Sequence, residues 1–185
     1  MPGIEGFFDK ATSTASFLVW DPVTRDAAII DAVLDFDAAT GKLGTRSADA
    51  VLARADVLGL KVIWALETHA HADHLSAANH VRKLTGARIG IGSRITEVQT
   101  QFRAMFGAPE AETEGAVFDR LFADGDTFRI GEVEARVMHT PGHTPACVTY
   151  VIEGAAFVGD TLFMPDYGTA RADFPGGDAT ALYRS

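Results

Sequence analysis

Short apolar runs of strand length, separated by turn residues, recur along most of this chain. Residues 15–20 and 27–31 are rich in β-branched and aromatic side chains, which predicts two strands. Turn-forming residues at 21–26 lie between them and predict a hairpin. Residues 61–66 form another apolar run, with the length and branching of a buried strand.

Apolar residues at helical spacing predict helices in the middle of the chain. One helix is expected over residues 47–58, with Ser47 as its N-cap and Gly59 as its stop. A second covers residues 75–84 and ends at Gly86. A third follows Ser93 as its cap. Its predicted inner face consists of Ile95, Val98, Phe102 and Phe106.

Strands return in the second half of the chain. Residues 88–91 predict a short strand, residues 127–130 and 133–138 a hairpin at Gly131, and residues 147–152 and 155–158 another. Residues 35–47 and 107–115 are expected to be loops, and residues 178–184 to begin a helix. This order of elements predicts an α/β fold with packed sheets and outer helices. A length of 185 residues suits one domain, residues 1–185.

Composition narrows the classes of partner and compartment. The net charge of -9 gives no general attraction to nucleic acid or to an anionic membrane. No apolar run approaches the roughly 20 residues that span a bilayer. The first residues lack the basic and apolar regions of a secretory signal. A single cysteine excludes an internal disulfide framework and indicates a reducing compartment, so we expect a cytoplasmic protein.

The segment 68–74, Thr-His-Ala-His-Ala-Asp-His, concentrates possible metal ligands between a predicted strand and a predicted helix. On an extended segment His69 and His71 would point the same way, and Asp73 and His74 could turn back toward them. Imidazole nitrogen and carboxylate oxygen bind zinc, iron and manganese. The alternative is a solvated helix N-terminus, which suits Asp73 but not three histidines.

Two later strand ends carry the same residue types. His143 lies in the turn at residues 139–144, and Asp160 follows the strand 155–158. Each could be an ordinary turn residue, but three strand ends with metal-binding side chains favour one metal site. His80 and His139 are expected to be non-ligands. Cys147 could bind metal or act as a nucleophile, but its apolar neighbours favour a small core residue.

These motifs resemble the signature of the metallo-β-lactamase superfamily in order and spacing, over nearly the whole chain. The resemblance implies an αββα sandwich with the metal site at the sheet edges. It implies that His69, His71 and His143 bind one metal, that Asp73 and His74 bind a second, and that Asp160 bridges the two. In the family further helices and a late histidine follow, so we expect a chain truncated after Ser185.

Within the superfamily the chain resembles the glyoxalase II branch, and most of all the persulfide dioxygenases. Their Arg-x-Asp-Phe element is matched by Arg171, Asp173 and Phe174, in a stretch that begins at Tyr167. The resemblance implies that these four residues contact substrate, and Arg171 is a candidate to hold a substrate carboxylate. It also implies an Fe²⁺ site formed by His69, His143 and Asp160, with open positions for O2 and substrate. His71, Asp73 and His74 would then orient the ligands and bound water without binding the iron themselves.

The leading hypothesis is therefore oxidation of glutathione persulfide, or a similar small persulfide, by O2 to sulfite. The alternative is a glyoxalase II-like thioester hydrolase, in which a metal such as Zn²⁺ activates water and Asp73 is the catalytic residue that orients or deprotonates it. A third possibility is a non-catalytic metal-binding protein, with a closed ligand set. Apolar surface left by an early C-terminus would favour a homodimer.

Overall fold

The computed structural model describes residues 1–185, and the chain divides into two compact units. The first unit consists of three segments: Met1–Glu67, His71–Ile89 and Phe128–Ala135. The second consists of Thr68–Ala70, Gly90–Thr127 and Arg136–Ser185. Each unit is described by itself.

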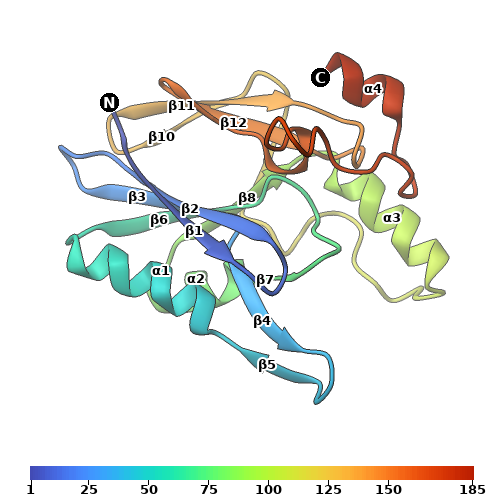
Figure 1. Cartoon of the computed structure of the whole chain (residues 1–185), viewed down its shortest axis with the longest axis horizontal. Helices are drawn as coiled ribbons and strands as arrows, with labels where there is room; N and C mark the ends of the chain where they lie inside the picture. The colour runs from blue at the N-terminus through green and yellow to red at the C-terminus, as the bar shows by residue number, and fades with distance from the viewer. The chain divides into compact units, whose positions relative to one another are not determined.

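A mixed sheet organises the first unit (Figure 1). Its strands, in spatial order, are β1 (Gly3–Asp9), β2 (Thr14–Trp20), β3 (Asp26–Ile30) and β6 (Lys61–Leu66). The first three are antiparallel neighbours, and β6 runs parallel to β3. The predicted hairpin and the predicted buried strand are confirmed. The sequence did not predict β1, because its glycines and half-exposed side chains weaken the strand pattern.

The expected loop at residues 35–47 is wrong, because most of it forms a hairpin. Strand β4 (Val33–Asp37) pairs antiparallel with β5 (Lys42–Gly44) on one side and with β7 (Leu75–Ser76) on the other. The turn is built by Asp37, whose carboxylate accepts hydrogen bonds from the backbone of Ala39 and the hydroxyl of Thr40. The same turn residues gave the segment its loop-like composition.

The first two helices lie close to their predicted places, but both begin differently. Helix α1 (Arg46–Val57) has Thr45 as its N-cap, so the prediction of Ser47 is wrong. The amide and hydroxyl of Ser47 instead donate to the carboxylate of Asp35. Helix α2 (Ala78–Thr85) ends at the left-handed Gly86, as predicted. It begins after residue 75 because β7 takes up residues 75 and 76. In this unit α1 packs on β4 and β6, and α2 packs on β6.

The second unit has its own apolar core beside a parallel strand pair. Residues 90–92 of β8 (Arg88–Gly92) pair with β9 (Arg120–Phe122), and α3 (Ile95–Met105) follows. The core contains Ile91, Ile95, Val98 and Ala146, with Ala70, Phe102, Phe118 and Leu121 packed against it. Two details of the α3 prediction are wrong: Arg94 rather than Ser93 is the N-cap residue, and Phe106 is 72% exposed.

The remaining strands match the predicted hairpins. Strands β10 (Thr127–Ile130) and β11 (Val133–His139) are neighbours joined at Gly131, which has a positive φ of 62°. In the second unit, β12 (Val148–Ile152) pairs antiparallel with β13 (Ala155–Phe157). A 3₁₀ turn, η1 (Gly159–Thr161), and helix α4 (Ala179–Arg184) follow. None of the helices is long and apolar enough to cross a bilayer.

Gly131 offers a direct test of the first unit, because its left-handed turn is closely packed. A Cβ at this position would lie 2.5 Å from an Asp21 carboxylate oxygen and closer still to the Thr24 hydroxyl. Gly41 also has a positive φ, but a Cβ there would meet nothing. We expect Gly41→Ala to lower the free energy of unfolding by about 1–2 kcal/mol. Gly131→Ala should lower the free energy of unfolding by roughly 3 kcal/mol or more, because the new methyl group also clashes with Asp21 and Thr24.

Chemical denaturation of the two variants and the parent protein measures this difference. Equal losses for Gly131→Ala and Gly41→Ala would show that only backbone strain counts, and that the packing of Asp21 and Thr24 around the turn contributes nothing.

Candidate metal centre

The segment 68–74 is an irregular loop between β6 and β7, and not the regular extended segment on which His69 and His71 were expected to point the same way. Asp73 and His74 are also not at a helix start, because α2 begins only at Ala78. The loop divides between the units: His69 belongs to the second, while His71, Asp73 and His74 belong to the first. Each unit therefore gathers its own group of possible ligands.

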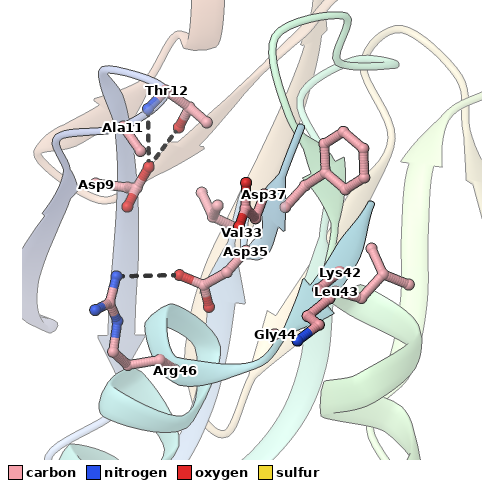
Figure 2. A pocket seen from close by; sticks show the side chains of 11 residues that line it. Asp9, Ala11, Thr12, Val33, Asp35, Asp37, Lys42, Leu43, Gly44 and Arg46 are labelled. Atoms are coloured by element: carbon pink, nitrogen blue, oxygen red, sulfur yellow. Dashed lines mark hydrogen bonds and ion pairs between the residues drawn. The ribbon is translucent and has the colours of Figure 1, made fainter. Parts of the chain in front are cut away.

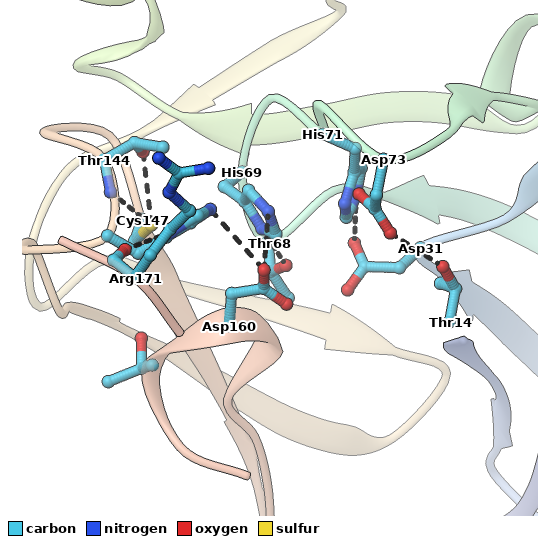
Figure 3. Close-up of polar contacts among 12 residues, drawn as sticks. Thr14, Asp31, Thr68, His69, His71, Asp73, Thr144, Cys147, Asp160 and Arg171 are labelled. Carbon is cyan, nitrogen blue, oxygen red and sulfur yellow. Dashed lines mark hydrogen bonds and ion pairs between the residues drawn. The ribbon is translucent and has the colours of Figure 1, made fainter. Parts of the chain in front are cut away.

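In the second unit, His69, His143 and Asp160 form a compact group whose ligand atoms lie within 4.8 Å of one another. One oxygen of Asp160, Oδ2, lies 3.4 Å from Nε2 of His143 and 3.8 Å from Nε2 of His69. Figure 3 shows this carboxylate facing the ring of His69. Ligand atoms of a first-row metal with bonds of about 2.0–2.2 Å are about 3.0–3.4 Å apart, so the spacing suits a metal after small adjustments.

Both imidazoles of this group are held through the ring nitrogen that does not face Asp160. Nδ1 of His143 donates to the backbone carbonyl of Arg171, at 2.8 Å. Because a carbonyl only accepts, Nδ1 carries the proton and Nε2 keeps its lone pair in the neutral ring. Nδ1 of His69 forms a hydrogen bond with the hydroxyl of Thr68 at 2.9 Å, which fixes the orientation of the ring. Both rings thus present Nε2, as metal-binding histidines with outer hydrogen bonds do.

A glycine allows the approach that places Asp160. Gly159 has a positive φ of 51° at the start of η1, and a Cβ there would lie 2.8 Å from the Cβ of Thr68. Gly142, directly before His143, is equally constrained, because a Cβ there would overlap the backbone of Leu182 in α4. The sequence predicted the turns but could not reveal which segments they approach.

In the first unit, His71, Asp73 and His74 form a second group with ligand atoms within 4.8 Å of one another. The two imidazole rings stack, with their centroids 4.1 Å apart. The hydroxyl of Thr14 donates to Oδ2 of Asp73 at 3.1 Å and orients the carboxylate (Figure 3). Nδ1 of His74 donates to the carbonyl of Leu75 at 3.0 Å, so the lone pair of this ring is on Nε2.

Nε2 of His74 is buried and has no hydrogen-bond partner in the structure. The residue is only 8% exposed. A buried polar atom without a partner costs about 1–3 kcal/mol, and a bound cation would remove that cost. The donor set of this group, two imidazoles and one carboxylate, suits a divalent transition metal. On both counts the residues present fit a metal ion.

Two buried carboxylates that the sequence analysis missed surround His71. Nε2 of His71 lies 3.1 Å from Oδ1 of Asp31 and 3.0 Å from Oε2 of Glu67. Burial alone would lower the pKa of His71, but the charges and hydrogen bonds of Asp31 and Glu67 raise this pKa well above its usual value. Asp31 directly follows β3 and Glu67 directly follows β6, and this position at a strand end is a local signal that could have drawn attention to them.

The predicted substrate residues lie in the second unit, around His143. The exposed guanidinium of Arg171 pairs with both carboxylate oxygens of Asp173, at 2.6 and 2.9 Å. The hydrogen bonds of this pair lower the pKa of Asp173 and raise that of Arg171. The ring of Phe174 lies edge-on to the imidazole of His143, with centroids 5.2 Å apart. Tyr167 is 81% exposed.

The residues predicted to be non-ligands all have other contacts. Nε2 of His80 bonds to Asp49 at 2.7 Å, and Nε2 of His139 bonds to the carbonyl of Pro145 at 2.8 Å. Cys147 is buried, and its sulfur accepts from the amide of Thr144. None of the three belongs to a group that could hold a metal.

A separate cavity of about 300 Å³ lies in the first unit, between β1, the β4–β5 hairpin and the start of α1 (Figure 2). The cavity is lined by both acidic and basic side chains. Arg46 lies 3.7 Å from Asp35, and Lys42 is also in the lining. No predicted site residue lines this cavity, so we do not connect it with the metal groups.

Replacement of Gly159 should test how the carboxylate of Asp160 is placed. We expect Gly159→Ala to weaken binding of Zn²⁺ by about 10–100-fold, as changes in the shell around metal ligands do. The reason is that the new methyl group must push η1 away from Thr68. Competition with a chromophoric chelator measures the affinity. The matched control is Gly168→Ala, where φ is also positive and a Cβ meets nothing. An equal loss in both variants would contradict the proposed role of the contact with Thr68.

Several known proteins are similar to this chain over most of its length. A probable metallo-hydrolase of Burkholderia pseudomallei is 54% identical over 98% of this chain and 66% of its own length. Glyoxylase B2 of Dictyostelium discoideum is 43% identical over 98% of this chain and 63% of its own length. The human mitochondrial persulfide dioxygenase ETHE1 is 33% identical over 96% of this chain and 59% of its own length. The chain thus spans between 43% and 66% of the length of the curated relatives it matches.

The fold prediction is tested by a solved structure and by a family model. The crystal structure of ETHE1 from Myxococcus xanthus matches 98% of this chain and 66% of its own, with 28% identity and a TM-score of 0.78. The predicted α/β fold is therefore confirmed. The relatives have the names of enzymes, in agreement with the prediction that this chain is an enzyme. The family model described as "Metallo-beta-lactamase superfamily" matches residues 10–185. The chain belongs to the metallo-β-lactamase superfamily.

Proposed function

We propose that the chain carries the metal site of a persulfide dioxygenase that oxidises glutathione persulfide, or a similar small persulfide, with O2. The observation that carries this proposal is the ligand group of the second unit, where His69, His143 and Asp160 come together. Two histidines and one carboxylate are the ligand set of many non-haem Fe²⁺ oxygenases, and they leave positions open for O2 and substrate. Similarity to the human persulfide dioxygenase ETHE1 supports the same choice.

The overall reaction would convert a persulfide, O2 and water into a thiol, sulfite and protons. The sulfur–sulfur bond breaks, the outer sulfur is oxidised, and O2 is reduced. Bound iron would supply the electron exchange between sulfur and oxygen. The protein would fix the ligands, through the hydrogen bond from His143 to the carbonyl of Arg171 and the hydrogen bond between His69 and Thr68.

Arg171 is proposed to hold a carboxylate of the thiol carrier. Its guanidinium already forms a bidentate pair with the carboxylate of Asp173, and a substrate carboxylate could adopt the same geometry. Both side chains of this pair are exposed, so exchange of one carboxylate for another costs little. Phe174, between Arg171 and His143, would form an apolar wall beside the metal. That Tyr167 contacts substrate stays a prediction.

The second candidate function is metal-dependent thioester hydrolysis. Two relatives with hydrolase or glyoxylase names are more similar to this chain than ETHE1 is. The second ligand group, His71, Asp73 and His74, favours this candidate, because a hydrolase with two metals needs further ligands. In that reaction Asp73 would orient or deprotonate the attacking water, and Zn²⁺ would be the metal. A cytoplasmic location and a homodimer remain predictions.

The central prediction is uptake of O2 by the iron-loaded protein when glutathione persulfide is added, with formation of sulfite. Asp160→Asn should lose at least about 100-fold of this activity, since it removes the only charged ligand of the group. The control is His80→Ala, which removes a half-buried side chain paired with Asp49. An oxygen electrode and a sulfite assay give the two readouts. The result that would favour the hydrolase instead has two parts. The iron-loaded protein takes up no O2 with persulfide, and the zinc-loaded protein cleaves a thioester independently of O2.

A separate prediction concerns the carrier. Arg171→Ala should raise KM for glutathione persulfide by about tenfold, because a charge-assisted hydrogen bond at an exposed site is lost. Metal content should stay unchanged, since His143 bonds to the backbone carbonyl of residue 171 and not to its side chain. Steady-state kinetics and metal analysis check both parts, with Arg103→Ala on α3 as control. A persulfide without carboxylates should show no difference between Arg171→Ala and the parent protein.

A further inference from the structure

Strand β1 (Gly3–Asp9) is the terminal strand of the sheet in the first unit, and only one of its two edges is paired. In that sheet β2 is its only neighbour, and the two strands pair at all seven residues of β1 without a bulge. A strand of this length extends for about 24 Å. The backbone N–H and C=O groups on the outer edge of a terminal strand are open to a further strand. The partner that fits this edge is therefore another extended segment.

Proteins usually protect a terminal strand, and β1 has little of this protection. Lysine, proline, bulges and a short length are the common means. The strand contains neither lysine nor proline. Glu5 pairs with Nε of Arg54 at 2.9 and 3.0 Å. Asp9 accepts from the hydroxyls of Thr12 and Ser47. Both carboxylates of the strand are thus bonded within this unit, and neither needs the outer edge to stay in water.

One face of β1 is apolar and exposed. Side chains alternate along a strand, so Ile4, Gly6 and Phe8 share a face. Ile4 is 43% exposed and Phe8 is 64% exposed. Between them the ring of Phe17 on β2 lies close to Gly6, since a Cβ at Gly6 would be 3.5 Å from a ring carbon. The result is an apolar stripe along the edge of the sheet.

The charges of β1 favour one register with a second copy of the same strand. Opposite residues in an antiparallel pair direct their backbone groups either both toward each other or both away, so a two-fold axis between identical strands passes through a residue. With the axis at Glu5, this residue faces its own copy. With the axis at Phe7, Glu5 faces Asp9 of the second copy. Like charges directly opposite are destabilising. With the axis at Gly6, all seven residues pair and no two charged residues are opposite.

The register with the axis at Gly6 also brings the exposed apolar side chains together. Ile4 of each copy then faces Phe8 of the other, and the two Gly6 residues face each other. Opposite side chains project from the same face with Cβ atoms about 4.5–5.5 Å apart, and aromatic–β-branched pairs are stabilising. The strand is therefore complementary to itself in both charge and apolar surface.

We infer that β1 is the contact through which two copies of this chain associate, with their β1 strands antiparallel and centred on Gly6. The contact is confined to one strand of each copy, whereas stable interfaces bury about 1,200–2,000 Å². The dimer is therefore weak, with a Kd on the order of 10 μM. The contact includes none of the possible metal ligands, so the inference does not rest on the proposed function. It also differs from the surface near Ser185 on which the predicted homodimer was based.

The test is sedimentation equilibrium of the whole chain over a range of concentrations. Two double variants are compared. Ile4→Lys with Phe8→Lys places lysine opposite lysine, and Ile4→Lys with Phe8→Glu places lysine opposite glutamate. Both remove the same apolar side chains and differ from each other at one residue. The control is Leu43→Lys with Leu84→Lys, which replaces two other apolar side chains of the first unit that are 61% and 63% exposed.

We expect the parent protein and the control to dimerise with the same Kd. Kd should rise by at least about 100-fold in Ile4→Lys/Phe8→Lys, because apolar pairs are lost and like charges face each other. Ile4→Lys/Phe8→Glu should bind at least about tenfold more tightly than Ile4→Lys/Phe8→Lys, because each lysine faces a glutamate. A parent protein that is monomeric at about 1 mM overturns the inference. So does a dimer that Ile4→Lys/Phe8→Lys leaves intact, or an equal Kd in the two double variants.

Hydrogen exchange of the parent protein tests the same contact without any substitution. Backbone amides of β1 should exchange at least about tenfold more slowly well above Kd than well below it, because the second copy pairs with the outer edge. Exchange of β1 that does not depend on protein concentration overturns the inference, even where a double variant fails to fold.

Discussion

Every histidine of the two ligand groups has one ring nitrogen bonded to another part of the protein, and the rest of the site depends on this constraint. His143 bonds to a backbone carbonyl, His69 to a hydroxyl, His74 to a backbone carbonyl and His71 to the carboxylate of Asp31. A ring held in this way loses little entropy when a metal binds. The cost of arranging the ligands is therefore met during folding.

That arrangement requires tight turns at strand ends, and glycine makes them possible. Gly142 and Gly159 stand directly before His143 and Asp160, both with positive φ. At each position a Cβ would collide with another segment of the second unit, at Leu182 or Thr68. The candidate metal ligands are thus placed by close backbone packing around them, which explains why residues without any metal-binding group should affect metal affinity.

The sequence predicts the fold and the candidate ligands where the local pattern is strong. The buried strands and the helix ends at Gly59 and Gly86 follow from periodicity and turn chemistry, which are local. The β4–β5 hairpin escaped prediction because its strands are half exposed and Asp37 builds the turn through its side chain. Asp31 and Glu67 escaped because their role depends on approach to His71, which spacing along the chain does not encode.

The two ligand groups differ in how they balance charge, and this difference bears on the choice between the candidate reactions. The group with Asp160 has a single carboxylate among its possible ligands, and its histidines are held by neutral partners. The group with Asp73 is backed by Asp31 and Glu67, so it carries more negative charge. A neutral shell leaves more of a metal's positive charge available to an anionic ligand such as a persulfide sulfur. A strongly negative shell instead raises the basicity of the bound imidazole and favours tight retention of the cation. On this reasoning the group with Asp160 is the better place for binding and oxidation of an anionic sulfur substrate, and the group around His71 is the better place to retain a cation.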